Sequence, residues 1–324
     1  MGDEKELRLL VTSAGGLTGT FLIRHLQRRP IEPYRYELIA ADSNGQSIAR
    51  HMCPAFYHVP RSDDPGYKEA IYRIIDQEKI DIVIPASSYD IPFYSANRDQ
   101  LAAKGVQCLI SDYQTNELLN HKRTMYELMH RIGVPVPQVY ASKKHIIYPA
   151  IIKACKSSGS VGVYKLENDL DYRYWTAKLQ DYVITAYVRG REFTVDCLFD
   201  ASGKQVLVST RERMQVRGGA VVVTRGVATP EAVQRIVRKL EAELTLIGPV
   251  NFQYIQDERG EVYLTDFNTR FASGGLPLTI AAGYDIPNLM IRLMLGQSVS
   301  AAPLPAKQGL TMYRYYDELF AQEV

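Results

Sequence analysis

The chain has 324 residues, of which 46% are hydrophobic and 23% are charged, and its formal net charge is +2. This length exceeds that of one ordinary hydrophobic core and suits two or three packed lobes of a globular protein. The near balance of charge excludes the broad basic surface that drives non-specific nucleic-acid binding. The sequence holds no apolar run near the roughly 18 residues of a membrane span, and its charged start lacks the apolar core of a signal peptide.

The first 115 residues alternate between short apolar strands and helical patterns. Strands are expected over 7–12, 37–41, 55–59, 80–85 and 106–111, and helices over 18–27, 67–78 and 95–104. Strands and helices of this length that alternate are typical of a parallel sheet covered on both faces. The sequence therefore predicts a doubly wound α/β domain over residues 1–115.

A different pattern follows this first part. A helix is expected over 115–131, closed by Gly133, and the V-P-V-P run at 134–137 cannot continue it. Beyond this boundary the chain is rich in paired strands, expected over 183–188, 193–199, 206–210, 250–256 and 261–267. The cysteines at 53, 108, 155 and 197 form no C-x-x-C pair, which indicates buried free thiols in a reducing, cytoplasmic setting.

The hairpin around D-E-R-G carries amide and carboxylate side chains. Because side chains alternate along a strand, a two- or four-residue loop would place on one face Asn251, Gln253, Asp266 and Asn268, together with the apolar Ile255, Val262 and Leu264. Oxygen ligands of this kind suit Mg²⁺ when phosphate oxygens complete its shell, and Arg270 lies close enough to hold a phosphate. A strand end with exposed polar residues is the alternative interpretation.

Lys153 ends an apolar strand and is followed at once by the Ser/Gly-rich stretch S-S-G-S-V-G. Such a loop offers backbone N–H groups to phosphate oxygens, and the lysine adds a point charge. The order of residues differs from a Walker A motif. A plain hairpin loop stays open as the other interpretation.

Three further features could contact ligands. Glu192 follows the turn at Gly190 and could accept hydrogen bonds from ribose hydroxyls, or be a solvated turn residue. A basic strand and loop contain Arg211, Arg213 and Arg217. These arginines could bind an anionic substrate or form a solvated face. Small residues that leave room for a substrate follow Arg270, at Ser273, Gly274 and Gly275.

A second hypothesis arises from the N-terminal turn A-G-G-L-T-G and Asp42, which partly match a dinucleotide-binding fingerprint. Tyr174 and Lys178 add a Y-x-x-x-K spacing. Together they suggest an NAD(P)-dependent short-chain dehydrogenase or epimerase. This hypothesis gives no role to the polar hairpin, and a tyrosine and a lysine four residues apart are common in a chain with 22 tyrosines.

In series, these motifs resemble the ATP-grasp superfamily, and most of all one unit of the carbamoyl-phosphate synthase large chain. The similarity runs from Leu7 to about Gly296 and includes I-D-I-V-I-P, H-K-R-T-M-Y-E-L-M-H-R-I-G-V-P-V-P, Y-P-A-I-I-K-A-C-K-S-S-G-S-V-G-V, V-R-G-R-E-F-T-V-D, G-P-V-N-F-Q-Y, D-F-N-T-R and A-G-Y-D-I-P-N-L. It implies a Rossmann-like pre-ATP-grasp domain over 1–115 and a two-lobed α+β ATP-grasp fold. The small lobe would span 116–190 and the metal-bearing C-terminal lobe 191–324.

The resemblance also implies residue roles. Lys122 and Lys153 would contact ATP phosphates, and Arg270 with Lys153 would take part in catalysis. The mobile loop over the phosphates would contain Ser157, Ser158, Gly159, Ser160 and Gly162. The adenine pocket would contain Thr185, Ala186 and Val188, with Glu192 on the ribose. The metal-facing residues would be Gln253, Asp266 and Asn268. The substrate would contact Asp90, Arg211, Arg213, Ser273 and Gly274.

The implied activity is an ADP-forming carboxylate–amine ligase that uses ATP with Mg²⁺ or Mn²⁺ and proceeds through an acyl phosphate. Its partners would be small-molecule carboxylates and amines, not nucleic acid or membranes, and a homodimer and a partner subunit both stay open. Three departures stand out: Asp266 replaces the usual glutamate, Thr185–Ala186 replaces an acidic pair, and there is a single unit. The first two motivate an alternative, a nucleotide-binding or regulatory subunit without its own ligase activity, and the third speaks against the full carbamoyl-phosphate reaction.

Overall fold

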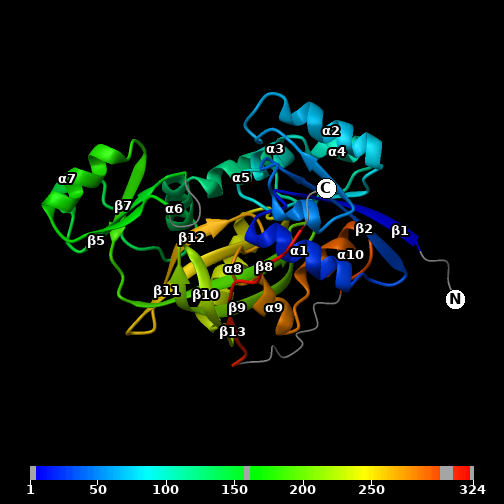
Figure 1. Cartoon of the computed structure of the whole chain (residues 1–324). Coiled ribbons are helices and arrows are strands. Elements are labelled where there is room, and N and C mark those ends of the chain that lie inside the picture. Colours follow the sequence, from blue (N-terminus) through cyan, green and yellow to red (C-terminus); the bar gives the residue numbers. More distant parts are fainter. Residues whose placement is uncertain (1–4, 157–160, 300–308, 322–324) are drawn as a thin grey trace.

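The computed structural model describes residues 5–156, 161–299 and 309–321. Three β-sheets and the helices around them make up these residues (Figure 1). The sheets have four, three and six strands and follow one another along the chain. The α/β fold class is confirmed, whereas the domain boundaries at 115 and 190 stay predictions.

The N-terminal sheet has only parallel strands, in the order β3-β2-β1-β4. These are β1 (Lys5–Thr12), β2 (Tyr34–Asp42), β3 (Ala55–His58) and β4 (Ile82–Pro85). Leu9 and Val11 pack on one face with α1 (Leu17–Arg28), whereas Leu10 packs on the other with α2 (Tyr67–Glu78). The predicted doubly wound arrangement is therefore confirmed, because residues that alternate in β1 enter two different cores.

Two expectations for this region are wrong. The helix expected over 95–104 is two helices, α3 (Ile91–Ala96) and α4 (Arg98–Ala103), separated at Asn97. The strand expected over 106–111 is reduced to one bridge, between Gln107 and Ile82. The chain then turns towards the six-stranded sheet, where Ser111 Oγ accepts a hydrogen bond from Ile247 N at 2.8 Å.

The helix expected over 115–131 is also divided, into α5 (Tyr113–Asn120) and α6 (Lys122–Arg131). His121 between them is extended, and the backbone N–H of Lys122 donates to the carbonyl oxygen of Cys155 at 3.0 Å. A tertiary hydrogen bond thus replaces a helical one, and it ties the start of α6 to the end of the following strand.

The three-stranded sheet lies at one end of the molecule with α7 (Asp169–Lys178) (Figure 1). Its antiparallel strands have the order β6-β5-β7 and are β5 (Ala150–Ala154), β6 (Val163–Leu166) and β7 (Tyr182–Ala186). Its small core consists of Ala150, Ile152, Leu166 and Ile184. The described residues also contain two short 3₁₀-helices, η1 (Ile48–His51) in the N-terminal part and η2 (Lys143–His145), whose Lys143 pairs with Asp169 of α7.

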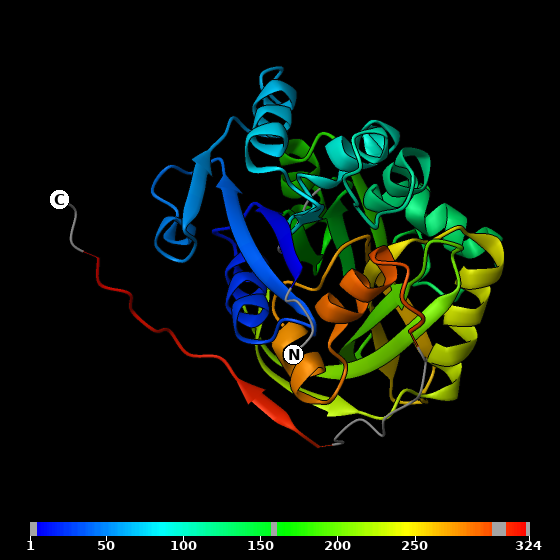
Figure 2. The same ribbon diagram turned by 90° about the vertical axis from the view of Figure 1, so that its right-hand side faces the viewer.

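The six-stranded sheet is antiparallel throughout, in the order β12-β11-β8-β9-β10-β13. Its strands are β8 (Gly190–Phe199), β9 (Gln205–Arg217), β10 (Ala220–Val227), β11 (Gly248–Asp257), β12 (Val262–Asn268) and β13 (Thr311–Tyr313). Figure 2 shows β13 at its outer edge. One face packs against α6 and α8 (Glu231–Glu243).

The other face of this sheet joins the N-terminal sheet. Leu198 and Leu207 belong to the same buried cluster as Leu9 and Val11. The same cluster includes residues of α9 (Leu276–Ala281) and α10 (Ile286–Met294). The two sheets therefore share one hydrophobic core. Among the helices of the described ranges, none combines the length and the apolar character that a membrane crossing requires.

Candidate functional site

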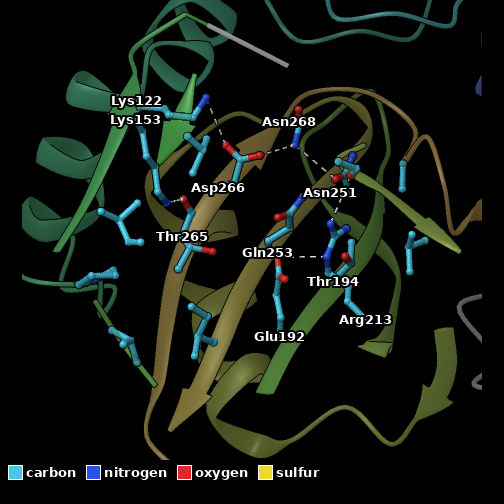
Figure 3. A pocket seen from close by; sticks show the side chains of 18 of the residues that line it. Lys122, Lys153, Glu192, Thr194, Arg213, Asn251, Gln253, Thr265, Asp266 and Asn268 are labelled. Atoms are coloured by element: carbon cyan, nitrogen blue, oxygen red, sulfur yellow. Dashed lines mark hydrogen bonds and ion pairs between the residues drawn. The ribbon is translucent and has the colours of Figure 1, made fainter. Parts of the chain in front are cut away.

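A cleft of about 320 Å³ lies between the three-stranded and six-stranded sheets. Its lining comes from β5, β6 and β7 on one side and from β8, β9, β11 and β12 on the other. Figure 3 shows polar side chains from both sides pointing into it. Two sheets thus place charged groups around one space.

The polar face of the hairpin forms as expected. In the register of β11 and β12, Asn251 lies opposite Asn268 and Gln253 lies opposite Asp266. Asn268 Nδ2 donates to Asp266 Oδ2 at 3.3 Å and to Asn251 Oδ1 at 3.4 Å, and all four line the cleft (Figure 3). The side-chain oxygens of these residues therefore gather on one face.

A β-bulge follows this polar face. The register shifts after the Gln253–Asp266 pair, so that Tyr254 lies opposite Leu264. The extra residue, Thr265, reverses the alternation, and Val262 and Leu264 enter the core instead of the cleft face. The expectation that Val262 and Leu264 share the polar face is therefore wrong, whereas Ile255 does line the cleft.

The bulge also positions Lys153. The carbonyl oxygen of Thr265 accepts hydrogen bonds from Lys153 Nζ at 2.9 Å and from the Tyr126 hydroxyl at 2.8 Å, and Lys153 Nζ donates to Tyr126 as well. Burial lowers the pKa of Lys153, and the nearby charges of Asp266 and Glu192 oppose this shift. Lys153 is thus a partly desolvated cation held by fixed partners.

Lys122 and Tyr126 come to the same place from α6. Lys122 Nζ lies 3.7 Å from Asp266 Oδ1, and the lysine side chain is almost fully buried. Sequence reasoning found Lys122 but missed Tyr126. The spacing of four residues, which places both side chains on one helix face, could have revealed it.

Arg270 connects the cleft with the N-terminal sheet. Its Nη2 donates to Asn268 Oδ1 at 3.3 Å, its Nη1 to the carbonyl oxygen of Phe271 at 2.7 Å, and its Nε to Ser88 Oγ. Burial lowers the pKa of Arg270, and Asp266 opposes that shift. Ser88 follows β4 of the N-terminal sheet. A residue outside the two sheets that line the cleft therefore helps to position this guanidinium.

Of the three arginines predicted on the basic strand and loop, Arg211 and Arg213 line the cleft and form ion pairs, whereas Arg217 does not line it. Arg213 Nε lies 3.0 Å from Glu192 Oε1, and Arg211 Nε donates to Asp196 Oδ2 at 3.1 Å. Arg211 Nη1 is buried, and within the described part of the chain it has no hydrogen-bond partner. A Cβ on Gly275 would lie 1.9 Å from Arg211 Cζ, so glycine leaves the space that this guanidinium fills.

The structure brings most of the remaining predicted residues to the same cleft, which is also lined by Thr185, Ala186, Val188, Ser273 and Gly274. Gly162 stands outside it, at the base of the β5–β6 hairpin, where its carbonyl oxygen accepts from Ala154 N at 2.8 Å. Asp90 lines a separate cavity. The loop residues Ser157, Ser158, Gly159 and Ser160 lie outside the described residues.

The dehydrogenase residues do not meet. Tyr174 and Lys178 stack on α7, with Nζ 5.7 Å from the ring centre, whereas Asp42 ends β2 at the other side of the molecule (Figure 1). Asp42 Oδ2 accepts a hydrogen bond from Gly15 N at 2.7 Å. The Y-x-x-x-K spacing is therefore a surface feature of a helix.

One cluster that the sequence did not reveal is His121, Cys155 and Asp181, whose potential metal-ligating atoms lie within 4.8 Å of one another. Asp181 already accepts from His121 Nε2 at 2.8 Å and from Arg123 at 3.2 Å. The adjacent arginine charge disfavours a cation there. The cluster instead links the start of α6 to the strand ends beside it.

The charge of the cleft is strongly biased. Its lining includes the cations Lys122, Lys153, Arg211, Arg213 and Arg270 but only two carboxylates, Glu192 and Asp266. Asp196 lies outside this lining but pairs with Arg211, so two positive charges are in excess. The lining also includes an apolar group, at Pro137, Ile151, Val163, Val188 and Ile255. A ligand with an apolar ring and several negative charges fits such walls.

Two family models match the chain. Residues 178–317 match the model described as "ATP-grasp in the biosynthetic pathway with Ter operon", and residues 9–109 match the PylC-like N-terminal domain. The large chain of carbamoyl phosphate synthase from Thermoplasma acidophilum is 22% identical over an alignment of 261 positions, and the alignment covers 72% of this chain and 25% of that protein.

Solved structures with the same fold include the biotin carboxylase domain of the 2-oxoglutarate carboxylase from Hydrogenobacter thermophilus, in complex with MgADP and bicarbonate. It superposes with a TM-score of 0.70 at 20% identity, covering 89% of this chain and 70% of that one. The L-amino acid ligase from Bacillus licheniformis superposes with a TM-score of 0.71 at 14% identity, covering 95% and 78%.

Residues 178–317 therefore resemble an ATP-grasp domain and residues 9–109 resemble a PylC-like N-terminal domain, and the fold is that of the superposed structures. The chain is also similar to the carbamoyl phosphate synthase large chain, although it spans only about a quarter of the length of the first such relatives.

Proposed function

We propose that this protein is an ATP-dependent carboxylate–amine ligase that forms ADP and proceeds through an acyl phosphate. The observation that carries the proposal is the cleft between the two antiparallel sheets, where five cations face one wall of side-chain oxygens. With the Arg211–Asp196 ion pair taken into account, an excess of two positive charges remains, and it favours the negatively charged triphosphate of a nucleotide.

In this proposal the nucleotide lies along the cleft. The adenine packs among the apolar residues near Thr185 and Val188, and its polar edge meets the backbone there. Glu192 accepts hydrogen bonds from the ribose, in exchange for part of its contact with Arg213. Lys122 and Lys153 neutralise phosphate oxygens, the role for which a positioned ammonium is suited.

The residues present fit a magnesium ion. Asp266, Asn268 and Gln253 offer one carboxylate and two amide oxygens on one face, and Asn251 adds another nearby. Mg²⁺ prefers hard oxygen ligands and is often held by one or two carboxylates together with substrate phosphates. When bound, it supplies positive charge to the phosphates and holds them in position.

The chain's own residues then position the transfer. Arg270 is aimed by Ser88 and Asn268 and holds the phosphoryl group that passes from ATP to a substrate carboxylate oxygen, with ADP as the leaving group. The amine nitrogen then attacks the acyl carbon, phosphate leaves with the bonding electron pair, and the nitrogen loses a proton. No side-chain nucleophile is needed, because positioning and charge neutralisation do most of the catalysis in phosphoryl transfer.

Several comparisons support this proposal. The similar biotin carboxylase domain was solved with MgADP, and a protein of the same fold is an amino acid ligase. The four cysteines are free, which supports a reducing compartment such as the cytoplasm as the place of action.

An alternative is a nucleotide-binding subunit without turnover of its own. It is motivated by the pairing of Lys122 with Asp266, since this ion pair must loosen before either group can serve phosphate or metal. Both candidate functions predict that the chain binds Mg·ATP, but only the ligase predicts that it catalyses a reaction.

The test is ADP release from Mg·ATP in the presence of paired carboxylates and amines, with each omitted in turn. A ligase releases ADP only when a suitable pair is present, and Lys153→Ala and Asn268→Ala lower that rate at least tenfold without unfolding the chain. The control is Lys178→Met on the exposed face of α7. Normal turnover in both site variants would contradict the assignment, and nucleotide binding with no ADP release for any pair would favour the alternative.

A further inference from the structure

Tyr126 connects three parts of the molecule at the base of the cleft. It lies on α6, it is 1% exposed, and its ring belongs to the core between α6 and the six-stranded sheet. Its hydroxyl donates to the carbonyl oxygen of Thr265 in β12 at 2.8 Å and accepts from Lys153 Nζ of β5 at 2.8 Å. One hydroxyl therefore links a helix, the three-stranded sheet and the six-stranded sheet.

The carbonyl oxygen of Thr265 can serve two donors because it lies outside the regular strand ladder. β12 is an edge strand of its sheet, and Thr265 is the bulge residue that has no partner residue in β11. A carbonyl oxygen has two lone pairs, and this one accepts both from the Tyr126 hydroxyl and from Lys153 Nζ at 2.9 Å (Figure 3). Tyr126, Lys153 and Thr265 thus form a closed triangle of hydrogen bonds.

The roles of donor and acceptor in this triangle are fixed. Burial raises the pKa of Tyr126 above its usual value, and the charge of Asp266 adds to this rise, so the hydroxyl keeps its proton. That single proton is directed to Thr265, and a lone pair of the hydroxyl oxygen is left for the ammonium of Lys153. An ammonium group only donates, so the reverse arrangement is not possible.

The triangle leaves one N–H group of Lys153 for a ligand. An ammonium has three N–H groups in tetrahedral positions, and two of them are directed to Tyr126 and Thr265. The third has no hydrogen-bond partner among the residues that the structure describes, and Lys153 lines the cleft. The direction of this third N–H is set by the other two.

The two lysines of the cleft differ in the charge of their partners. Lys122 Nζ lies 3.7 Å from the carboxylate of Asp266, which offsets its charge. Lys153 is held by a hydroxyl and a carbonyl oxygen, which are both uncharged. Burial lowers the pKa of Lys153, and these two acceptors favour its protonated form. Uncharged partners fix the position of a cation without neutralising it, which suits a group that binds an anion.

We propose that Tyr126 is a positioning residue of the ligase, which holds Lys153 against Thr265 so that the third N–H of the ammonium points at a phosphate oxygen of the nucleotide. The proposal rests on the proposed function, and Tyr126 itself does not line the cleft. A lysine that is already fixed loses little conformational freedom when it binds phosphate. Tyr126 therefore increases the affinity for the nucleotide through Lys153 alone.

The first measurement needs no nucleotide. The unliganded chain is treated briefly with dilute acetic anhydride, and mass spectrometry gives the rate of acetylation of Lys153 relative to the exposed Lys178 of α7. Tyr126→Phe keeps the buried ring, and Thr265 keeps its hydrogen bond from Lys153, so the variant should fold. Acetylation of Lys153 is expected to be about threefold faster in the variant, because the amine has lost one of its two acceptors.

The second measurement is a double-mutant cycle on binding of Mg·ADP, with Lys153→Met as the other change. In the wild-type background, Tyr126→Phe is expected to weaken binding about fivefold. In the Lys153→Met background it should have no further effect, because the tyrosine reaches the nucleotide only through the lysine. A tyrosine with a merely structural role would weaken binding by the same factor in both backgrounds.

Tyr254→Phe is the matched control. Tyr254 is also fully buried in the same core, its ring stacks on Phe193, and its hydroxyl has no hydrogen-bond partner within the described ranges. This variant removes a buried hydroxyl that does not contact Lys153. It should leave both the acetylation of Lys153 and the binding of Mg·ADP unchanged.

The outcomes separate the two proposals. Unchanged acetylation of Lys153 in Tyr126→Phe, or an equal loss of Mg·ADP binding in both backgrounds of the cycle, would overturn the positioning role. Equal effects of Tyr126→Phe and Tyr254→Phe would overturn it as well. A wild-type chain that does not bind Mg·ADP would instead contradict the proposed function, and the acetylation rates would still decide whether Tyr126 holds Lys153.

Discussion

Asp266 is the one carboxylate on the polar face of the hairpin, and it is shared between two possible partners. In the structure it pairs with Lys122 at 3.7 Å and accepts from Asn268 at 3.3 Å. In the proposed complex it holds magnesium, and Lys122 turns to the phosphates. The same side chain therefore determines how strongly binding of the metal increases the affinity for the nucleotide.

Asp266→Asn separates these roles. Titration of ADP into the wild-type protein should give binding that is strengthened at least tenfold by Mg²⁺, whereas the variant should lose most of that strengthening. Binding of ADP without metal should persist, since Lys122 is released from its ion pair. An undiminished effect of Mg²⁺ in Asp266→Asn would place the metal elsewhere.

The buried carboxylate of Asp90 makes a prediction about stability. Its pKa is about 6 in the folded chain against 3.8 in the unfolded chain, so the folded state binds more protons between these values. The contribution of Asp90 to stability is complete below pH 3.8 and is lost as the pH rises through about 6. Ionised Asp90 therefore destabilises the fold at neutral and basic pH.

Asp90→Asn should accordingly be more stable than the wild type at pH about 8, by on the order of 1–3 kcal/mol, and should gain little near pH 4. Chemical denaturation at the two pH values measures this difference. A residue with a purely structural role would behave in the opposite way, because its replacement would destabilise the chain at pH 8.

At the residue scale, the sequence could indicate the groups with a strong local signal. Lys153 at a strand end, Asn268 and Asp266 on one hairpin face, and Arg270 beyond them all line the cleft. Tyr126 and the carbonyl oxygen of Thr265 were not predicted. The β-bulge that exposes this carbonyl oxygen interrupts the alternation of side chains from which the hairpin face was predicted. Their roles in catalysis stay predictions.

At the level of elements, the backbone at the start of β11 packs unusually close to the backbone of another segment. Gly248 has a φ of +81°, and a Cβ there would lie 2.2 Å from the carbonyl oxygen of Leu109, in the segment that leaves the N-terminal sheet. Gly105 has nearly the same φ, +80°, but nothing lies within 4 Å of its Cβ position. The two glycines thus differ in packing and not in backbone conformation.

This pair allows strain to be separated from contact. Gly105→Ala should cost about 1 kcal/mol of unfolding free energy, from the left-handed backbone alone. Gly248→Ala should cost clearly more, about 3 kcal/mol or above, because the backbone of Leu109 must also move. Urea denaturation of both variants measures the difference. Equal losses of unfolding free energy would mean that the backbone at Leu109 moves away from residue 248 at no cost.

Elements were predictable where their own pattern decides them. The helix over 67–78 matches α2 at both ends because Ile71, Ile74 and Ile75 form a buried stripe. The division of α5 from α6 could not be foreseen, since its cause is a hydrogen bond from Lys122 N to Cys155 O, more than thirty residues away.

At the scale of the whole molecule, the N-terminal sheet packs closely against the six-stranded sheet that carries one wall of the cleft. His25 Nε2 lies 2.7 Å from Asp285, Tyr36 donates to Asn288 at 2.9 Å, and the two sheets share one core. The order of strands and helices predicted the fold class, because alternation and pairing are local. The relative orientation of the lobes depends on such long-range contacts, and the hydrophobic periodicity of the sequence does not predict them.

The proposed function requires above all that the cleft between the two antiparallel sheets binds Mg·ATP. Its most direct test is the melting temperature of the wild-type protein and of Lys153→Ala with ADP, ATP and NADPH, each with and without Mg²⁺. ADP and ATP are expected to stabilise the wild type, more strongly with Mg²⁺ than without it, and Lys153→Ala is expected to lose this stabilisation. Stabilisation by NADPH alone, or an unchanged response in Lys153→Ala, would contradict it.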